Sequence, residues 1–171
     1  TSLTDIDAGK TSYEYDALGR VTKQTDARGN ITTNTYNASG LLTTQVCGGV
    51  TTTYSYDSRL RLTKESTGSQ SIAYEYDDKN RLTKKSYSID GTSLSYSYVY
   101  NSYGQMTAQT FPDGMTENYT YDSYGNLATI KIGGQRVWEL NSYNGTQRTA
   151  YLGTAPLILT KNYSAKGLLT G

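Results

Sequence analysis

The sequence predicts an all-β protein, a long antiparallel meander of β-hairpin repeats that forms a curled or spiral sheet. Three observations predict it. A pattern of about ten residues recurs about every 20–21 residues, the segments within it alternate with period two and are rich in tyrosine, threonine and serine, and glycine-containing turn signals separate these segments. The chain has 171 residues, so about eight such repeats fit into it.

The composition favours a thin sheet over a filled core. The chain contains 18 tyrosines but one phenylalanine, and leucine, isoleucine, valine and phenylalanine together make up only about a sixth of it. A net charge of +1 with 18% charged residues lacks the self-repulsion of disordered chains. We therefore expect tyrosine rings and threonine methyl groups to form the apolar layer of half-buried strands.

The repeats form a single array over residues 1–171. The first unit, residues 13–22, reads Tyr-Glu-Tyr-Asp-Ala-Leu-Gly-Arg-Val-Thr. Further units lie near residues 34–43, 54–63, 74–83, 98–107, 119–128 and 161–170, and a decayed copy lies near 138–147.

Each unit predicts two half-strands joined by a tight turn. Tyr-x-Tyr ends one strand and x-Leu-Thr begins the next, because both alternate with period two. The Asp-x-x-Gly between them predicts a three-residue loop, a type I turn followed by a left-handed residue. The residues expected to build the repeat are the tyrosines Tyr13, Tyr15, Tyr36, Tyr54, Tyr56, Tyr74, Tyr76, Tyr98, Tyr100, Tyr119 and Tyr121, the aspartates Asp16, Asp57, Asp77 and Asp122, and the glycines Gly19, Gly40, Gly104, Gly125 and Gly167.

Two turns depart from the glycine rule. Asn80 tolerates the left-handed conformation at small cost, whereas Leu60 does not, so we expect a local distortion at the hairpin of Leu60.

The same loop places its first residue opposite the residue after the glycine. This predicts the ion pairs Asp16/Arg20, Asp57/Arg61 and Asp77/Arg81, whereas Asp122 opposite Asn126 fits the scheme less well. Such exposed cross-strand pairs contribute only about 0.2–1 kcal/mol each, so they tune the register of the strands.

A second set of turn signals lies at the opposite ends of the strands. These signals are Arg28-Gly29-Asn30, Gly48-Gly49, Thr67-Gly68, Asp90-Gly91, Pro112-Asp113-Gly114 and Gly133-Gly134. Each unit then has two strands and two turns, which gives about 14–16 strands in all.

Two segments depart from the average unit. The tyrosine directly before the turn recurs every 20–21 residues in neighbouring repeats, but Tyr76 and Tyr100 lie about four residues further apart. This predicts two extra residues in each strand of one hairpin, around residues 87–95. The aliphatic segment 155–159 predicts one more strand. At about 4.8 Å per strand a flat sheet would span about 70 Å, so we expect it to curl.

The motif Tyr-x-Tyr-Asp-x-x-Gly-Arg-Leu-Thr, as it stands at 13–22, 54–63 and 74–83, resembles the YD repeat, or Rhs repeat. This family includes Rhs-type polymorphic toxins, bacterial wall-associated proteins, insecticidal toxin complexes and teneurins. The resemblance implies a partial Rhs/YD shell, a spiralling β-sheet that in toxin-bearing members encloses a C-terminal toxic domain. It also implies a secreted or surface-displayed bacterial protein, whose partners are the rest of its own chain and surface glycans. The Asp-Pro-x-Gly motif of the family's self-cleaving core has no counterpart here, since neither proline follows an aspartate.

Several function classes are excluded by composition. The chain has no histidine, which excludes Ser-His-Asp and Cys-His catalysis and histidine-containing zinc sites. Its single cysteine, Cys47, forms no internal disulfide and is expected to be a free thiol without a role. The near-neutral charge favours no nucleic-acid partner, and no apolar run reaches the ~20 residues of a membrane span. We expect no catalytic residues, no metal and no cofactor.

Three alternatives to a non-enzymatic scaffold stay open. The repeated tyrosine faces, flanked by polar side chains, could stack on sugars and make the chain a carbohydrate-binding or adhesive module. The turn aspartates could hold calcium, although they are spaced about 20 residues apart. A carboxylate pair could act as a hydrolase, although nothing singles out two of the 15 acidic residues.

The ends of the chain carry a further expectation. The sequence begins at Thr1 and ends at Gly171 inside a repeat, so we expect a segment of a longer protein. Its outer strands would then have unpaired edges, which predicts edge-to-edge self-association.

Overall fold

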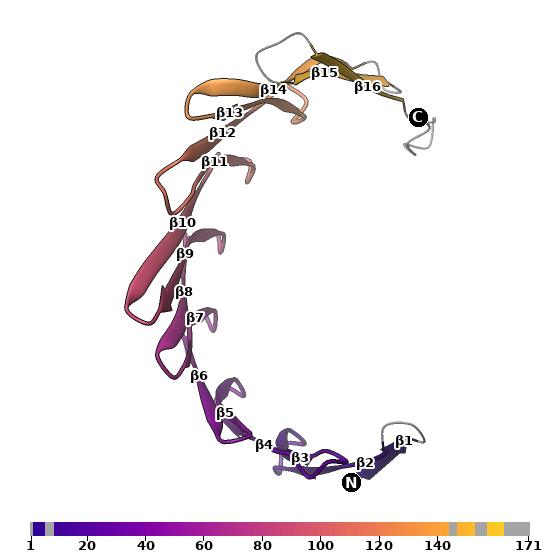
Figure 1. Cartoon of the computed structure of the whole chain (residues 1–171), viewed down its shortest axis with the longest axis vertical. Helices are drawn as coiled ribbons and strands as arrows, with labels where there is room; N and C mark the ends of the chain where they lie inside the picture. The colour runs from indigo at the N-terminus through magenta and orange to yellow at the C-terminus, as the bar shows by residue number, and fades with distance from the viewer. Residues whose placement is uncertain (1, 6–8, 144–146, 153–156, 163–171) are drawn as a thin grey trace. The chain divides into compact units, whose positions relative to one another are not determined.

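The computed structural model describes residues 2–5, 9–143, 147–152 and 157–162, and it describes side chains from residue 10 to residue 140. This part of the chain contains sixteen strands and no helix, as predicted (Figure 1). The strands are β1 (Ser2–Asp5), β2 (Gly9–Tyr15), β3 (Val21–Thr25), β4 (Ile31–Tyr36), β5 (Leu42–Cys47), β6 (Val50–Tyr56), β7 (Leu62–Thr67), β8 (Gln70–Tyr76), β9 (Leu82–Ile89), β10 (Thr92–Tyr100), β11 (Met106–Thr110), β12 (Thr116–Tyr121), β13 (Leu127–Ile132), β14 (Gln135–Tyr143), β15 (Gln147–Leu152) and β16 (Leu157–Asn162).

The strand order in the sheet follows the order in the chain, which makes the fold a meander. The chain forms two compact units, residues 1–94 and 95–171, and the division falls within β10. In each unit, neighbouring strands pair in antiparallel fashion, as β6 does with β7 and β12 with β13. Each unit is an open, curled sheet. The predicted all-β meander is thereby confirmed.

Between residues 10 and 140, where side chains are described, the sheet has no buried core. From residue 10 to residue 140 every side chain is at least partly exposed. In β4 and β6, half-buried and exposed positions alternate, so one face of these strands is better covered than the other. The better covered face of β6 carries Tyr54 and Tyr56. The strands therefore form a single layer in which side chains shield each other along one face, as the composition predicts.

A three-residue loop closes one end of the hairpin in each of six repeats, as the Asp-x-x-Gly signal predicts. In the first of them, the Gly19 amide donates to the Asp16 carbonyl at 3.0 Å, and the Asp16 amide donates to the Arg20 carbonyl at 3.0 Å. The same two bonds recur in the tips that begin at Asn37, Asp57, Asp77, Asn101 and Asp122. Beside each tip the register shifts by a bulge, which sets Tyr15 opposite Val21 and Tyr56 opposite Leu62. We call these six loops the tips.

The distortion expected at Leu60 is absent, and that prediction is wrong. Leu60 has a φ of 65°, close to the 64° of Asn80 at the equivalent position. Its amide donates to the Asp57 carbonyl at 3.0 Å, as the glycine amide does in other tips. The hydrogen bonds of the loop and the sheet on both sides hold the left-handed conformation, so the strain is accepted at one residue and does not spread.

The opposite edge uses two kinds of turn. One kind is a two-residue turn. Gly48-Gly49, with φ values of 57° and 80°, is such a turn and joins β5 to β6. Three-residue loops close the hairpins at residues 26–30 and 111–115. One hairpin is longer than its neighbour. Strands β9 and β10 have eight and nine residues, whereas β7 and β8 have six and seven. The expected lengthening of this hairpin is confirmed. The predicted strand in the tail corresponds to β16, although residues 155 and 156 lie outside the described residues.

Candidate functional site

The carboxylate of the tip aspartate organises its own loop. Oδ1 of Asp57 accepts hydrogen bonds from the backbone amides of Arg59 at 2.9 Å and Arg61 at 3.0 Å. Oδ2 of Asp57 accepts from Nε of Arg61 at 2.7 Å. One carboxylate therefore satisfies two loop amides and one guanidinium, which explains why a short acidic residue begins the tip.

The same arrangement lowers the pKa of the tip carboxyls. The pKa of Asp16 lies below its ordinary value chiefly because of the hydrogen bond from the Arg20 amide, and the pKa of Asp77 is lowered in the same way by Arg81. For Asp57 the side-chain hydrogen bond from Arg61 comes first. These aspartates are thus held as carboxylates, the form that accepts the loop hydrogen bonds.

The predicted ion pairs are present. Nε of the arginine lies 2.6 Å from Oδ2 of the aspartate in Asp16/Arg20 and in Asp77/Arg81. The third pair, Asp57/Arg61, closes at 2.7 Å.

Asp122 and Asn126 fit better than the sequence suggests. Nδ2 of Asn126 donates to Oδ2 of Asp122 at 3.0 Å, so an amide replaces the guanidinium and lowers the pKa of Asp122. The tip at Asn101 is built from amides alone, because Nδ2 of Asn101 donates to Oε1 of Gln105 at 2.7 Å. The tip therefore also forms when an amide replaces the guanidinium, or when amides replace both charged groups.

The arginine of one tip reaches the next repeat. Nη1 of Arg61 donates to the Asp77 carbonyl at 3.0 Å and to Oδ1 of Asn80 at 3.0 Å. Cζ of Arg61 also lies 4.7 Å from the ring centroid of Tyr76. Arg20 stacks on Tyr36 at the same 4.7 Å. The arginine thus ties two consecutive tips together, through a hydrogen bond and a cation–π contact.

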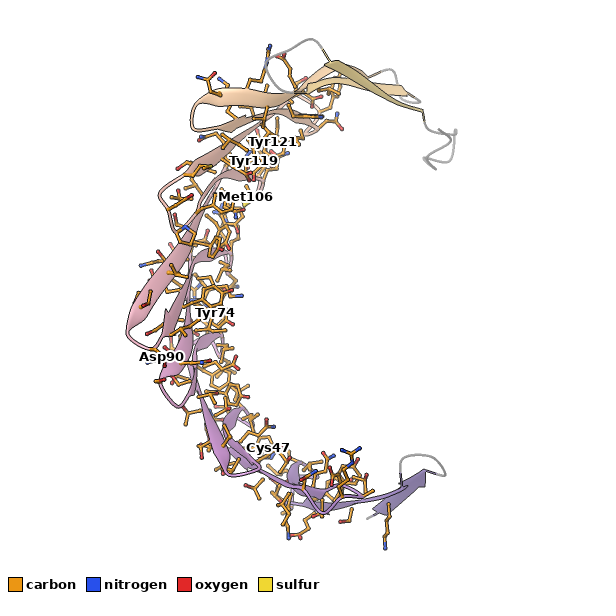
Figure 2. The ribbon with its side chains drawn as sticks, in the orientation of Figure 1. Cys47, Tyr74, Asp90, Met106, Tyr119 and Tyr121 are labelled. Atoms are coloured by element: carbon orange, nitrogen blue, oxygen red, sulfur yellow. The ribbon has the colours of Figure 1, made fainter. Side chains whose placement is uncertain are left out.

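In four repeats the tyrosine directly before the tip ties its repeat to the preceding one. Its hydroxyl donates to the backbone carbonyl of the first strand residue after the preceding tip. The distances are 2.8 Å for Tyr36 to Val21, 2.8 Å for Tyr56 to Leu42, 2.9 Å for Tyr76 to Leu62 and 2.7 Å for Tyr121 to Met106. Figure 2 labels the two residues of the last bond, Tyr121 on β12 and Met106 on β11. We call this set of bonds the tyrosine ladder.

The first tyrosine of each pair has more varied surroundings. The rings of Tyr13 and Tyr15 lie 6.4 Å apart, and Nζ of Lys85 lies 5.7 Å from the ring of Tyr74. Burial raises the pKa of Tyr54, and the Glu65 carboxylate adds to the shift. Burial likewise raises the pKa of Tyr119 to about 12, together with the hydrogen bond that its hydroxyl donates to Glu117. None of these shifts activates a hydroxyl for chemistry near neutral pH.

The remaining site residues follow the same plan. Tyr98 lies opposite Gln109, and Tyr100 lies opposite Met106. The tip glycines have left-handed φ values, 78° for Gly19, 83° for Gly40, 85° for Gly104 and 83° for Gly125. Gly167 lies outside the described residues.

Sequence reasoning missed one copy of the carboxylate loop. Asp26 accepts hydrogen bonds from the amides of Arg28 at 2.9 Å and Asn30 at 2.8 Å, so it repeats the tip geometry at the opposite edge. The signal was present, since Asp26 precedes Gly29 by the same three residues. The tyrosine ladder was missed because it joins residues of different repeats, which the spacing within one motif does not reveal.

The described side chains offer little for catalysis or cofactor binding. They include no group of three or more acidic or cysteine residues placed to hold a metal ion. Cys47 is a free, exposed thiol. No helix in this part of the chain is long and apolar enough to cross a membrane. The geometry instead joins consecutive repeats within each unit through the tyrosine hydroxyls.

The arrangement agrees with known proteins. A family model described as Teneurin YD-shell matches residues 12–171. No curated protein matches the chain.

Three solved structures show a similar fold over 94% of this chain. They are a TcdB2–TccC3 complex (TM-score 0.51, 20% identity), a TcdB2–TccC3–Cdc42 complex (TM-score 0.50, 19% identity) and a Tc holotoxin pore from Photorhabdus luminescens (TM-score 0.50, 19% identity). The chain spans only 13% of the length of each of these proteins. At this identity the similarity shows the fold alone.

Proposed function

The chain belongs to the teneurin YD-shell family, and from this membership we propose that it is a non-enzymatic scaffold, a segment of the wall of a β-shell. In the full-length protein, which we propose to be a secreted or surface-displayed bacterial protein, this wall encapsulates or presents a C-terminal, toxin-like polypeptide. Its partner is then the rest of its own chain. The eight repeats of residues 1–171 form one array within that wall.

One observation carries the proposal: the described sheet is a single layer without a buried side chain between residues 10 and 140. A layer of this kind has two accessible faces, as a wall has. Its stability depends on contacts from repeat to repeat, such as those of Arg61 and Tyr76. The fold shared with Tc toxin proteins supports the same role.

Protease protection tests the scaffold. The full-length protein is treated with trypsin, and the digestion of the segment that follows the repeats is compared with that of the same segment expressed alone. An enclosing wall predicts much slower digestion in the full-length protein, and faster digestion when Tyr36, Tyr56 and Tyr76 are all changed to alanine. Equal digestion of the free and attached segment would contradict the proposal.

The alternative from the sequence is a carbohydrate-binding or adhesive module that uses the repeated tyrosine faces. The hydroxyls of Tyr36 and Tyr76 already donate to backbone carbonyls, and an arginine lies over each of these rings. This favours a structural role for the tyrosines of the ladder. Binding on a glycan array that is lost in Tyr36→Ala and Tyr76→Ala variants with an intact sheet would support the adhesive module instead.

The proposal that the chain is not an enzyme has its own test. The purified chain is incubated with polysaccharides and with casein, and the products are measured. Turnover that disappears when the acidic residues Asp57, Asp77 and Asp122 are replaced by asparagine would contradict a purely structural role.

A further inference from the structure

Two neighbouring tips of the second unit enclose a groove. They are residues 101–105, between β10 and β11, and residues 122–126, between β12 and β13. The space between them has a volume of about 780 Å³, and its lining includes Tyr103 and Tyr124. The two tyrosines occupy the same position in their loops, directly before the glycine.

These two side chains are the most exposed large hydrophobic residues in the described part of the chain. Tyr103 is 88% exposed and Tyr124 is 90% exposed. Neither side chain has a hydrogen bond or ring contact among the described residues, in contrast to the tyrosine ladder. Paired aromatic rings beside a groove are typical of a binding surface, because tyrosine supplies a large contact area with little loss of conformational entropy.

Most polar side chains of the groove are engaged within the protein. Oδ1 of Asn101 accepts from the amides of Tyr103 and Gln105, and Nε2 of Gln105 donates to the Gly125 carbonyl at 2.9 Å. Asp122 accepts from the amides of Tyr124 and Asn126. The groups left free to contact a ligand are therefore the rings and hydroxyls of Tyr103 and Tyr124 and the hydroxyl of Ser123. A ligand recognised by stacking and by its carbonyl oxygens fits this set better than a ligand with many hydroxyls.

The spacing of the tips matches one regular polypeptide conformation. Adjacent tips are two strands apart, which places them about 9.6 Å from each other along the sheet. A polyproline II helix has three residues per turn and rises 3.1 Å per residue, so the same face recurs about every 9.3 Å. Two rings on neighbouring tips can therefore contact residues i and i+3 of one polyproline II segment.

We propose that the Tyr103–Tyr124 groove binds a proline-rich segment in the polyproline II conformation. Prolines three residues apart stack on the two rings, and the tyrosine hydroxyls donate to backbone carbonyls, which this conformation leaves without internal hydrogen bonds. Both the groove and its ligand are formed before binding, which reduces the entropy lost on association. The inference goes beyond the scaffold role and does not depend on it.

Nuclear magnetic resonance tests the groove directly. The ¹⁵N-labelled chain is titrated with an acetylated and amidated decaproline peptide, which carries no charge. We expect saturable shifts of the Tyr103, Gly104, Tyr124 and Gly125 amides. Tyr103→Ala and Tyr124→Ala each weaken binding about tenfold, since each removes one stacked ring.

Three controls separate stacking from folding and from charge. Tyr103→Phe and Tyr124→Phe keep the rings and lose the hydroxyls, so they weaken binding less than the alanine variants do. Lys79→Ala, at the same loop position of the first unit, leaves binding unchanged. A glycine–serine peptide of equal length does not bind. The amide spectrum outside the two tips checks that each variant remains folded.

Three results would overturn the proposal. They are the absence of decaproline binding, equal binding of the glycine–serine peptide, and binding that persists in the Tyr103→Ala, Tyr124→Ala double variant. Cellohexaose shifting the same amides when decaproline does not would also overturn it, and would identify the groove as a sugar site.

Discussion

The two units of the molecule build the same tip from different side chains. In the first unit the tip at Asp57 uses a carboxylate and Arg61, and Arg61 extends to the next repeat. In the second unit the tip at Asn101 uses an amide and Gln105, and Gln105 makes the link through Nε2 to the Gly125 carbonyl. The charge is therefore dispensable, whereas a donor that reaches the next tip recurs in both units.

A second contrast lies inside the first unit. The tip at Asn37 has Leu41 where the other three tips of the first unit have arginine, so no guanidinium reaches from it to the ring of Tyr56. The hydroxyl of Tyr56 nevertheless donates to the Leu42 carbonyl at 2.8 Å. Because the tyrosine ladder occurs in both units and beside every kind of tip, we infer that it is the general link between repeats and that the arginine is an addition.

The largest expected effect comes from the one strained leucine. Leu60→Gly should stabilise the first unit by about 1 kcal/mol, because a non-glycine residue in the left-handed region costs roughly 1–2 kcal/mol. The matching change Gly104→Leu should destabilise the second unit by a similar amount. Denaturant unfolding followed by circular dichroism measures both. A Leu60→Gly variant less stable than the parent would show that the leucine side chain makes contacts that outweigh its strain.

Removing one hydroxyl tests whether the ladder is equal in the two units. Tyr76→Phe and Tyr121→Phe should each cost about 1 kcal/mol, the net value of a hydrogen bond whose acceptor stays in place. Amide hydrogen exchange in the flanking strands reports the loss locally. As a control, Tyr124→Phe removes a hydroxyl that has no partner among the described residues and should change nothing. If only one of the two substitutions lowered stability, the tyrosine ladder would not be a link common to both units.

Exchanging the tip donors tests the arginine. Arg61→Gln should cost about 0.5–1 kcal/mol, since it loses the ion pair with Asp57 and the cation–π contact with Tyr76 but retains a donor. Leu41→Arg should gain a similar amount by supplying the missing contact to Tyr56. Thermal unfolding of the two variants and of the double variant measures these changes. The comparison between tips fails if Leu41→Arg is neutral while Arg61→Gln is costly.

Lowering the pH should have the smallest effect, and it should affect the tip of Asp57 but not the tip of Asn101. Since the pKa of Asp57 lies below its ordinary value of 3.8, the tip is fully stabilised above about pH 4 and loses this stabilisation as the pH falls through the lowered pKa. The Arg59 and Arg61 amides, which donate to this carboxylate, should shift in ¹⁵N spectra below pH 4. The Tyr103 and Gln105 amides donate to the neutral Asn101 and should not. Asp57→Asn should abolish the shifts of the Arg59 and Arg61 amides.

Much of the fold could be predicted from local signals. The Asp-x-x-Gly spacing predicts the three-residue tips, and the alternation of tyrosine and threonine predicts the strands, because both depend on residues close in the chain. The ion pair Asp16/Arg20 follows from the same loop. The prediction of a distortion at Leu60 was wrong, because it considered only the local backbone preference of leucine. The strands on both sides of the loop hold Leu60 in the left-handed conformation.

The links between repeats could not be predicted in this way. The bond from Tyr36 to Val21 joins residues 15 apart in the chain, and the groove of Tyr103 and Tyr124 depends on two tips separated by two strands. A motif repeated identically is compatible with many offsets between its copies, and only strand pairing selects one of them. The sequence by itself determined the hairpin unit and its period. The tertiary structure decided which side chains of successive units meet, because those contacts depend on the register of the assembled sheet.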